Sequence, residues 1–365
     1  MSTELKIAVL ESIRKDEFRI PLHPNHFSLI HKQNNQLFFQ YDYAKNFSQN
    51  DSAIKAFGFS TASRKELLEM ADVIFLLKPT VDDLKKMKPG TILVGWCHAV
   101  QQLNIAKVAQ ERSLTLIAME SMYSPNNQEH EHLFYRNNYL AGSLGVEHAL
   151  NSVPFQYERN AKISIISYGA VSQGAAAKLI EKGFTDITVF SRRNANEINN
   201  KLKEARYQTV TSRKNRFLIP SGEELKETLL ASDIIVNGIM QDVLHPYYFL
   251  FQKDLKNTHN KLIIDLSCDD HMGFDFACST SIDNPIINIE DNFYYAVDHV
   301  PTLAWKEISV DISEKLLPIL NGFLIGKFDN ALYETLINAT EIQDGKIRNK
   351  TIAQYQNKVN SEVAV

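Results

Sequence analysis

Residues 162–182 read KISIISYGAVSQGAAAKLIEK. An apolar run at 163–166 leads into a turn of small residues, and a helix is expected over 174–182. This order is typical of a dinucleotide site, because glycine permits the tight turn and the helix N-terminus offers free N–H groups to phosphates. Two residues depart from the motif: Ser167 holds the first glycine position, and Gly174 lies two residues beyond the usual third. The alternative interpretation is that these residues form an ordinary tight turn between a strand and a helix, as in any α/β protein, without binding a nucleotide.

The rest of the chain repeats this alternation of strands and helices. The other apolar runs that we expect to form strands are 7–10, 73–77, 91–94, 114–118, 187–190, 233–236 and 261–265. Further helices are expected at 63–71, 100–112 and 307–327, and the polar stretch 341–365 is expected to be a docked or frayed tail. Strands that alternate with helices indicate parallel sheets with crossover helices. We therefore expect an α/β fold with two doubly wound, Rossmann-like domains and an interdomain cleft.

Composition narrows the class of protein. The 365 residues suffice for two domains at roughly 100–200 residues each. The formal net charge of −4, from 39 Lys and Arg against 43 Asp and Glu, argues against a nucleic-acid-binding protein. Three cysteines without a CxxC pattern make a disulfide framework or a structural zinc site unexpected, and no metal site is predicted. Without an apolar signal core or an apolar run of ~18 residues, the chain is expected to be cytoplasmic.

The end of the second strand of this unit bears on the choice of cofactor. The strand at 187–190 is followed by Ser191, Arg192 and Arg193, with no carboxylate where NAD-binding folds usually place one on the ribose. A hydroxyl and two guanidinium groups suit a 2′-phosphate, because guanidinium binds phosphate through charge-assisted hydrogen bonds. We expect NADP(H) as the preferred cofactor, with NAD(H) as the alternative. The competing interpretation is that both arginines belong to a solvated loop.

Four polar residues outside the turn are candidates for chemistry. Lys78 and His98 each follow an apolar run, where the carboxyl ends of parallel strands line a ligand crevice. Arg19 lies between apolar neighbours and can bind a carboxylate, while an imidazole moves protons near neutral pH. The fourth candidate is either Asp269 or Asp270, which follow the 261–265 strand and could orient a catalytic histidine or an amine. The structural alternatives are a satisfied loop histidine, a snorkelling arginine and a capping aspartate.

These residues resemble a known family, the alanine dehydrogenases and pyridine nucleotide transhydrogenases, together with the saccharopine dehydrogenases. The resemblance rests on the Glu17–Leu22 segment, Lys78-Pro79, Trp96–His98 and Asp269. Within the family, the chain is most similar to the N5-(carboxyethyl)ornithine synthase branch. The matching blocks are 61–66, 92–98, 171–175, 233–239 and 294–301.

The resemblance implies a function and an assignment of residues. The implied reaction is the NADPH-dependent reduction of the imine that a pyruvate-like 2-oxo acid forms with an amino-acid amine, giving an N-carboxyalkyl amino acid. His98, Lys78 and Asp269 are the implied catalytic residues, and Arg19, Lys78 and His98 the implied substrate-binding residues. The implied cofactor-binding residues are Ser167, Gly169, Ala170, Val171, Ser172, Gln173, Gly174, Ser191, Arg192, Arg193, Asn237, Gly238, Ile239, Asp298, His299 and Val300.

The resemblance also implies an inserted domain. The substrate domain would comprise residues 1–130 and 316–365, with the dinucleotide-binding domain at 131–315 between them, and a homodimer is expected by analogy. Two stretches, 271–277 and the part beyond 330, have no counterpart in the ornithine-linked branch. Because the segment after Lys78 lacks the glutamate common in alanine dehydrogenases, ammonia is not the expected amine. An ammonia-dependent amino-acid dehydrogenase and a non-catalytic nucleotide-binding protein remain the alternatives.

Overall fold

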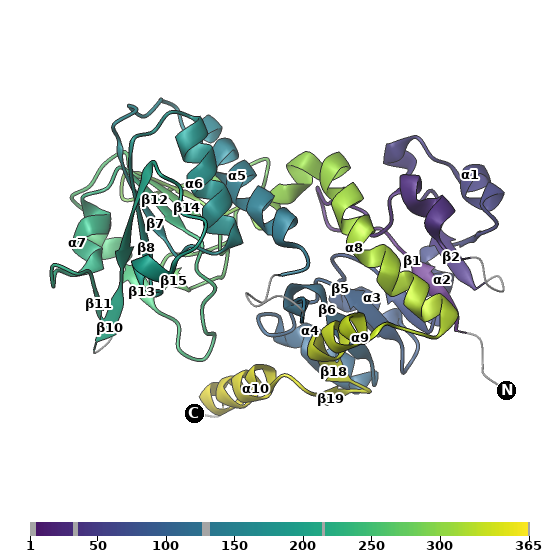
Figure 1. Cartoon of the computed structure of the whole chain (residues 1–365). Helices are drawn as coiled ribbons and strands as arrows, with labels where there is room; N and C mark the ends of the chain where they lie inside the picture. Colours follow the sequence, from purple (N-terminus) through teal and green to yellow (C-terminus); the bar gives the residue numbers. More distant parts are fainter. Residues whose placement is uncertain (1–4, 32–35, 126–131, 214–215, 364–365) are drawn as a thin grey trace. The chain divides into compact units, whose positions relative to one another are not determined.

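A computed structural model describes residues 5–31, 36–125, 132–213 and 216–363. The chain divides into two compact units, which Figure 1 labels by their elements. Unit 1 comprises Met1–Tyr135 and Ala304–Val365, and unit 2 comprises Arg136–Leu303. The sequence predicts that the inserted domain ends at residue 315. In the structure unit 2 ends at Leu303, so the chain returns to unit 1 earlier than expected.

Unit 1 is built on an eight-stranded sheet. In spatial order the strands are β19 (Lys346–Ile347), β18 (Thr340–Gln343), β6 (Thr115–Ala118), β5 (Ile92–Gly95), β4 (Val73–Phe75), β1 (Ile7–Val9), β2 (Leu37–Gln40) and β3 (Ser60–Ala62). Strands β1 to β6 are parallel and lie in the order 3-2-1-4-5-6. That order is typical of a doubly wound fold, in which ligands bind outside the carboxyl ends of the strands.

Two of the short helices of unit 1 begin at capping boxes that the sequence provides. Its α-helices are α1 (Asp51–Ala56), α2 (Arg64–Met70), α3 (Val81–Lys86), α4 (Leu103–Glu111), α8 (Trp305–Ile325), α9 (Asn330–Asn338) and α10 (Lys350–Val363). Capping boxes start α2, with Ser63 and Glu66, and α3, with Thr80 and Asp83. The Oγ atom of Ser309 on α8 accepts a hydrogen bond of 3.1 Å from the backbone N–H of Ile20. This bond anchors the first turns of α8 in unit 1 and accounts for the earlier boundary.

Unit 2 repeats the same architecture. Its main sheet runs β16 (Ile286–Ile289), β17 (Asn292–Tyr295), β14 (Leu262–Asp265), β12 (Ile234–Asn237), β7 (Lys162–Ile166), β8 (Asp186–Ser191) and β9 (Ala205–Thr209). Only β16 is antiparallel, and the other six strands again follow the order 3-2-1-4-5-6. Helices α5 (Tyr135–Ser152), α6 (Ala170–Glu181) and α7 (Leu225–Leu230) accompany it. Two small sheets are added: β10 (Thr211–Arg213) with β11 (Arg216–Leu218), and β13 (Tyr248–Leu250) with β15 (Gly273–Phe274).

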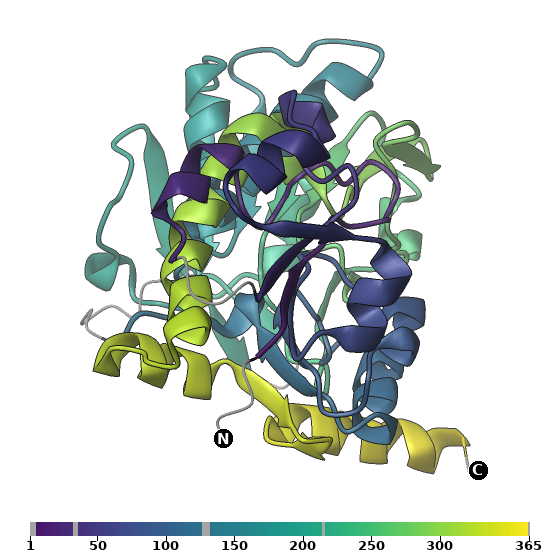
Figure 2. The same ribbon diagram turned by 90° about the vertical axis from the view of Figure 1, so that its right-hand side faces the viewer.

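The expected fold class, two doubly wound Rossmann-like domains, is confirmed. The expectation of a docked or frayed tail at 341–365 misses the regular structure there. Strand β18 pairs antiparallel with β6, and α10 contacts α4 (Figures 1 and 2). Pairing with β6 satisfies the backbone of β18, and Ile342 and Ile352 are fully buried in the core of the unit. The polar composition of this stretch therefore concealed the antiparallel pair of β18 and β19 and the helix α10.

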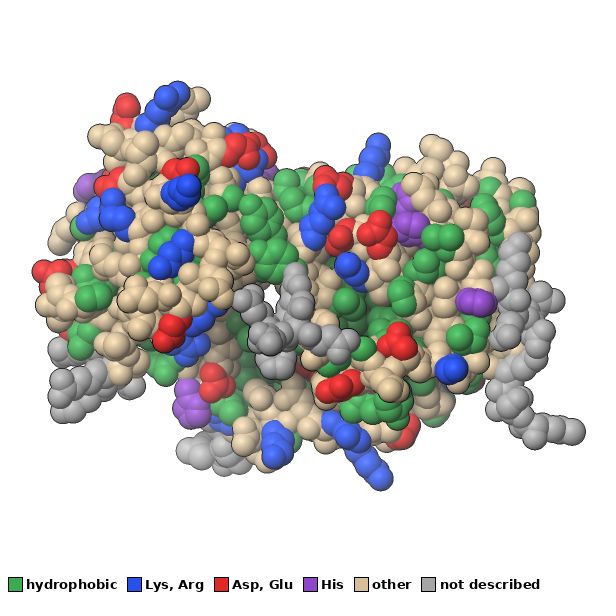
Figure 3. Space-filling view, viewed as in Figure 1, with side chains coloured by type: hydrophobic (Ala, Val, Ile, Leu, Met, Phe, Trp, Pro, Cys, Tyr) green, Lys and Arg blue, Asp and Glu red, His purple; other side chains and the backbone are tan. Residues whose placement is uncertain are grey.

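The surface agrees with the nearly balanced charge. On the face that Figure 3 shows, Lys and Arg side chains are scattered among Asp and Glu side chains. Among the described residues, every helix is too short or too polar to cross a membrane.

Candidate active site

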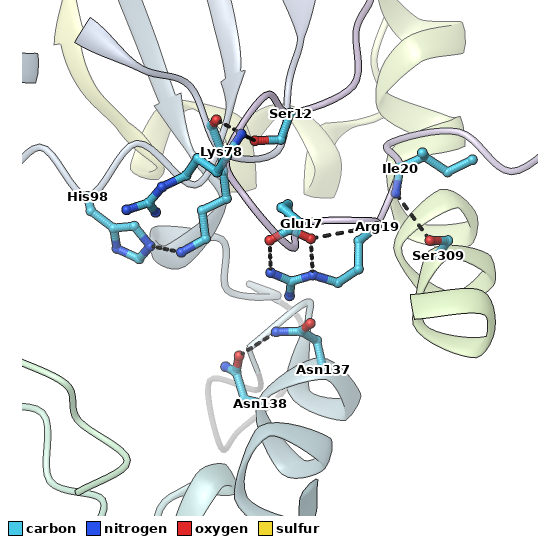
Figure 4. A network of polar contacts seen from close by, with 10 residues as sticks. Ser12, Glu17, Arg19, Ile20, Lys78, His98, Asn137, Asn138 and Ser309 are labelled. Carbon is cyan, nitrogen blue, oxygen red and sulfur yellow. Dashed lines mark hydrogen bonds and ion pairs between the residues drawn. The ribbon is translucent and has the colours of Figure 1, made fainter. Parts of the chain in front are cut away.

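Lys78 and His98 lie together in unit 1. They follow β4 and β5, which are parallel neighbours, so both side chains start from the same edge of the sheet. The Nζ atom of Lys78 is 3.1 Å from Nε2 of His98 (Figure 4). The Lys78 carbonyl accepts a 3.0 Å hydrogen bond from Oγ of Ser12. An ammonium and an imidazole in contact can polarise a carbonyl and move a proton beside it.

Arg19 is held by a residue that the sequence analysis did not select, Glu17. The Nε atom of Arg19 donates to Oε1 of Glu17 at 2.7 Å, and Nη2 donates to Oε2 at 2.5 Å (Figure 4). Both side chains are buried, and the guanidinium lies 5.0 Å from the ring centroid of Trp96. Burial alone would raise the pKa of Glu17, but the charges of Arg19 and Lys78 hold it below its usual value. Arg19 is thus a preorganised cation that Glu17 already engages.

Glu120 supports His98 from the next strand. It follows β6, and its Oε1 accepts a hydrogen bond from the backbone N–H of His98. This bond holds His98 at a φ of 47°, in the left-handed region that non-glycine residues rarely occupy. Burial, and then the neighbouring charge of Glu341, raise the pKa of Glu120 to about 8. Glu120 therefore keeps its proton at neutral pH.

In unit 2, the turn after β7 has the geometry of a phosphate-binding turn. Ser167 has a φ of 80°, which explains why glycine is usual at this position. Gly169 is the N-cap of α6, so this helix begins at Ala170, four residues before the predicted start. Ala170, Val171 and Ser172 occupy its first three positions, where backbone N–H groups lack intrahelical partners, whereas the N–H of Gln173 donates to the Gly169 carbonyl at 2.9 Å.

Gly174 has a packing role in the structure. A Cβ atom at this position would lie 1.8 Å from the carbonyl oxygen of Tyr139 on α5. Across the same contact, a Cβ at Gly142 would lie 1.8 Å from the carbonyl oxygen of Val171. The two glycines let α5 and α6 cross with their backbones in contact. The position of Gly174, two residues beyond that of the third motif glycine, follows from this crossing of α5 and α6.

A cavity of ≈ 330 Å³ opens beside the turn. Of the predicted cofactor residues, those that line it are Ser167, Gly169, Ser191, Arg192, Arg193 and Ile239. The two arginines differ in their surroundings. Both are exposed, but Nη2 of Arg193 donates a 2.6 Å hydrogen bond to the carbonyl of Tyr168 and so braces the turn. The lining also includes the apolar Phe217 and Phe249, which the sequence analysis did not select.

Other predicted cofactor residues serve the fold of unit 2. Asn237 is fully buried, and its Nδ2 donates to Oδ1 of Asp265 at 3.0 Å. A Cβ at Gly238 would lie 2.4 Å from Oγ of Ser172, which is itself buried. Val300 belongs to the hydrophobic core. Any contact of these residues with a nucleotide remains a prediction.

Asp269 lies in an acidic part of unit 2. Burial, and then the charges of Asp298 and Asp270, raise its pKa to about 6. His299 follows Asp298 in the segment between β17 and residue 300. Fully buried Asp265 has a pKa raised by burial to about 7 and accepts a 3.0 Å hydrogen bond from the Tyr294 hydroxyl. Asp269 is thus able to exchange a proton near neutral pH.

Comparison with known proteins gives the family. A family model described as "Alanine dehydrogenase/PNT, N-terminal domain" matches residues 8–140. The N(5)-(carboxyethyl)ornithine synthase of Clostridium botulinum is 25% identical over 324 residues, covering 85% of this chain and 92% of that protein. The one from Lactococcus lactis subsp. lactis is 26% identical over 327 residues, covering 86% and 93%.

Solved structures agree. An L-alanine dehydrogenase superposes with a TM-score of 0.73 at 17% identity, covering 97% of this chain and 99% of that one. A transhydrogenase from Sinorhizobium meliloti gives a TM-score of 0.69 at 13% identity, covering 93% and 99%. Residues 8–140 thus match the N-terminal domain of the alanine dehydrogenase and pyridine nucleotide transhydrogenase family, and the chain is similar to the named relatives over most of its length. It is therefore an oxidoreductase of a family that binds nicotinamide nucleotides.

The residues of unit 2 fit such a nucleotide. The turn at Ser167, the free N–H groups of α6 and the adjoining cavity together suit a pyrophosphate and an adenosine. Ser191 and Arg192 lie at the end of β8, where the adenosine ribose of such folds is recognised.

Proposed function

We propose that this protein reduces, with NADPH, the imine formed between a 2-oxo acid and the amine of an amino acid, giving an N-carboxyalkyl amino acid. The observation that carries the proposal is the 3.1 Å contact between Lys78 and His98, with Arg19 held by Glu17 in the same unit. The names of the 25–26% identical relatives support the choice of an amino-acid amine as co-substrate.

The residues of unit 1 would act in sequence on the oxo acid. Arg19 binds its carboxylate, and the ammonium of Lys78 polarises its carbonyl. The neutral amine attacks the carbonyl carbon, and His98 carries one proton from the attacking nitrogen to the carbonyl oxygen, which gives a carbinolamine. The imidazolium of His98, protonated from solvent, then donates a second proton to the hydroxyl, so that water leaves and the iminium remains. Bound NADPH supplies the hydride that reduces this carbon. Asp269 is the acidic group we assign to balancing the charge of the iminium.

The preference for NADPH rests on the end of β8. The exposed Arg192 and the hydroxyl of Ser191 provide a cation and a donor for a 2′-phosphate, in a place without a carboxylate. Arg193, which donates to the Tyr168 carbonyl, would act through the shape of the turn.

The experiment follows NADPH absorbance with pyruvate and either ammonia or a panel of diamino acids that includes ornithine and lysine. Oxidation that requires an amino-acid amine, with water as co-product and an N-carboxyethyl amino acid identified by mass spectrometry, is the expected result. Oxidation with ammonia alone would make the protein an ammonia-dependent dehydrogenase. NADPH binding without turnover on any oxo acid would make it a nucleotide-binding protein.

A further inference from the structure

The C-terminal tail of the chain (residues 327–363) brings a buried acid close to the candidate site. Strand β18 pairs with β6 through Thr340 and Ile342, and Glu341 lies between these two residues. The Glu341 side chain is shielded from solvent, although β18 lies outside the six parallel strands, between β6 and β19. A buried carboxyl is costly unless it is bound by other groups, so its contacts are informative.

Glu341 is anchored on both sides. Its Oε1 accepts hydrogen bonds from Oγ of Ser121 at 3.0 Å and from Nδ2 of Asn349 at 3.2 Å. Its backbone carbonyl accepts from the N–H groups of Arg348 and Asn349, at 2.7 and 3.0 Å. These bonds connect the start of α10 to Ser121, the residue directly after Glu120.

Glu120 and Glu341 share one buried environment. Each has an oxygen, Oε2, that is shut off from solvent and lacks a hydrogen-bond partner among the described residues. Burial raises the pKa of both carboxyls, and Glu341 adds its charge to the effect on Glu120. Two neighbouring buried carboxyls cannot both ionise cheaply, so one proton stays with the pair.

The other titratable groups around Glu120 include Lys78 and His98 of the candidate site. Lys78 after β4 acts on it electrostatically, and Nδ1 of His98 after β5 lies 3.8 Å from its Oε1. Cys97 lies next to His98, and burial followed by the charges of Glu120 and Glu341 raises its thiol pKa. Nε2 of His132 lies 3.1 Å from the Glu120 backbone carbonyl. The charge of Glu120 is therefore placed to affect the contact between Lys78 and His98.

We propose that Glu341 of the C-terminal tail is a positioning residue of the active site, which keeps Glu120 neutral so that Lys78 stays on His98. This inference rests on the proposed function. A neutral Glu120 accepts the His98 N–H without competing for the ammonium of Lys78. An ionised Glu120 would attract that ammonium. Lys78 would then no longer contact His98 or polarise the carbonyl of the oxo acid.

The test compares Glu341→Gln, which removes the charge and retains an acceptor for Ser121, with two other variants. Glu341→Asp retains the charge, and Glu334→Gln removes one carboxyl from the exposed part of α9 in the same tail. The pH profile of kcat/KM in the NADPH assay is measured for each. In Glu341→Gln we expect the loss of activity at high pH to begin about one pH unit lower, because Glu120 then ionises more easily. Glu341→Asp and Glu334→Gln should keep the wild-type profile.

A second measurement does not depend on turnover. Carbon-13 NMR of labelled glutamate follows the titration of Glu120, whose signal is identified by its loss in Glu120→Gln. We expect wild-type Glu120 to titrate near the value of about 8, and about one unit lower in Glu341→Gln. A wild-type titration near the ordinary value of 4.5 overturns the proposal even if Glu341→Gln does not fold. A Glu120 titration and a kcat/KM profile that are both unchanged in Glu341→Gln also overturn the proposal. If the protein shows no turnover but Glu120 titrates as expected, only the proposed reaction is refuted.

Discussion

Replacing Glu17 with glutamine tests the central ion pair of unit 1. The Glu17 side chain is 0% exposed and that of Arg19 is 3% exposed, so the variant removes the carboxylate that the buried guanidinium contacts. Removing one member of such a pair costs about 3–5 kcal/mol. With a urea dependence of about 2 kcal/mol per molar, the unfolding midpoint should fall by about 1.5–2.5 M.

Fluorescence isolates unit 1 in this measurement. The two tryptophans of the chain, Trp96 and Trp305, both belong to unit 1. Urea unfolding followed by their emission therefore reports this unit. Glu69→Gln is the matched control, because the Glu69 side chain is 54% exposed and its contact with Lys65 is 4.0 Å long. The control should change the free energy of unfolding by less than about 1 kcal/mol.

The pH dependence adds a second criterion. Because the folded pKa of Glu17 is lowered from 4.5, its stabilisation is complete above that value and is lost as the pH falls through the folded pKa. The difference between wild type and Glu17→Gln should therefore be full at pH 7 and shrink in acid. In Glu17→Gln/Arg19→Met, where both charges of the pair are removed, most of the lost stability should return. A Glu17→Gln midpoint equal to that of Glu69→Gln at pH 7 would refute the reasoning.

Three further predictions concern the proposed roles. His98→Ala should lower kcat by about 10²–10⁴ with NADPH affinity unchanged, since it removes one acid–base group; wild-type turnover with an unaltered pH profile would exclude that role. Arg192→Asp should weaken NADPH binding about 10–100-fold in a fluorescence titration and leave NADH binding unchanged, whereas equal losses would contradict recognition of the 2′-phosphate. Gly174→Ala should destabilise unit 2 by about 3 kcal/mol, because the added methyl group meets the Tyr139 carbonyl. If the variant melted at the wild-type temperature in circular dichroism, the close crossing of α5 and α6 would be refuted.

The sequence predicts both sheets because their central strands are short apolar runs with helices between them. Strand β7 and the small-residue turn after it are recognisable from local pattern alone. Lys78 and His98 are also predictable as neighbours, since parallel strands bring their carboxyl ends to one edge. Their roles in catalysis remain predictions.

What the sequence conceals depends on contacts between distant residues or on irregular backbone. Glu17 and Arg19 are two residues apart in a segment without regular structure, where no periodicity predicts that they will pair. Glu341 reaches Ser121, the neighbour of Glu120, only because β18 adds to β6, and a polar sequence gives little sign of such a strand. Gly174 resembles a motif glycine shifted by two residues, but its place follows from the crossing with α5.

The interrupted course of unit 1 has a consequence for biosynthesis. Unit 2 is continuous in the chain, whereas unit 1 needs α8 and β18 from the far side of it. At about 5–20 residues per second, a ribosome needs on the order of ten seconds or more to traverse unit 2. During that interval the nascent β6 lacks its neighbour β18, and Ile20 lacks the hydroxyl of Ser309. Unit 2 can thus fold first, and the earliest-made strands of the protein are among the last to be completed.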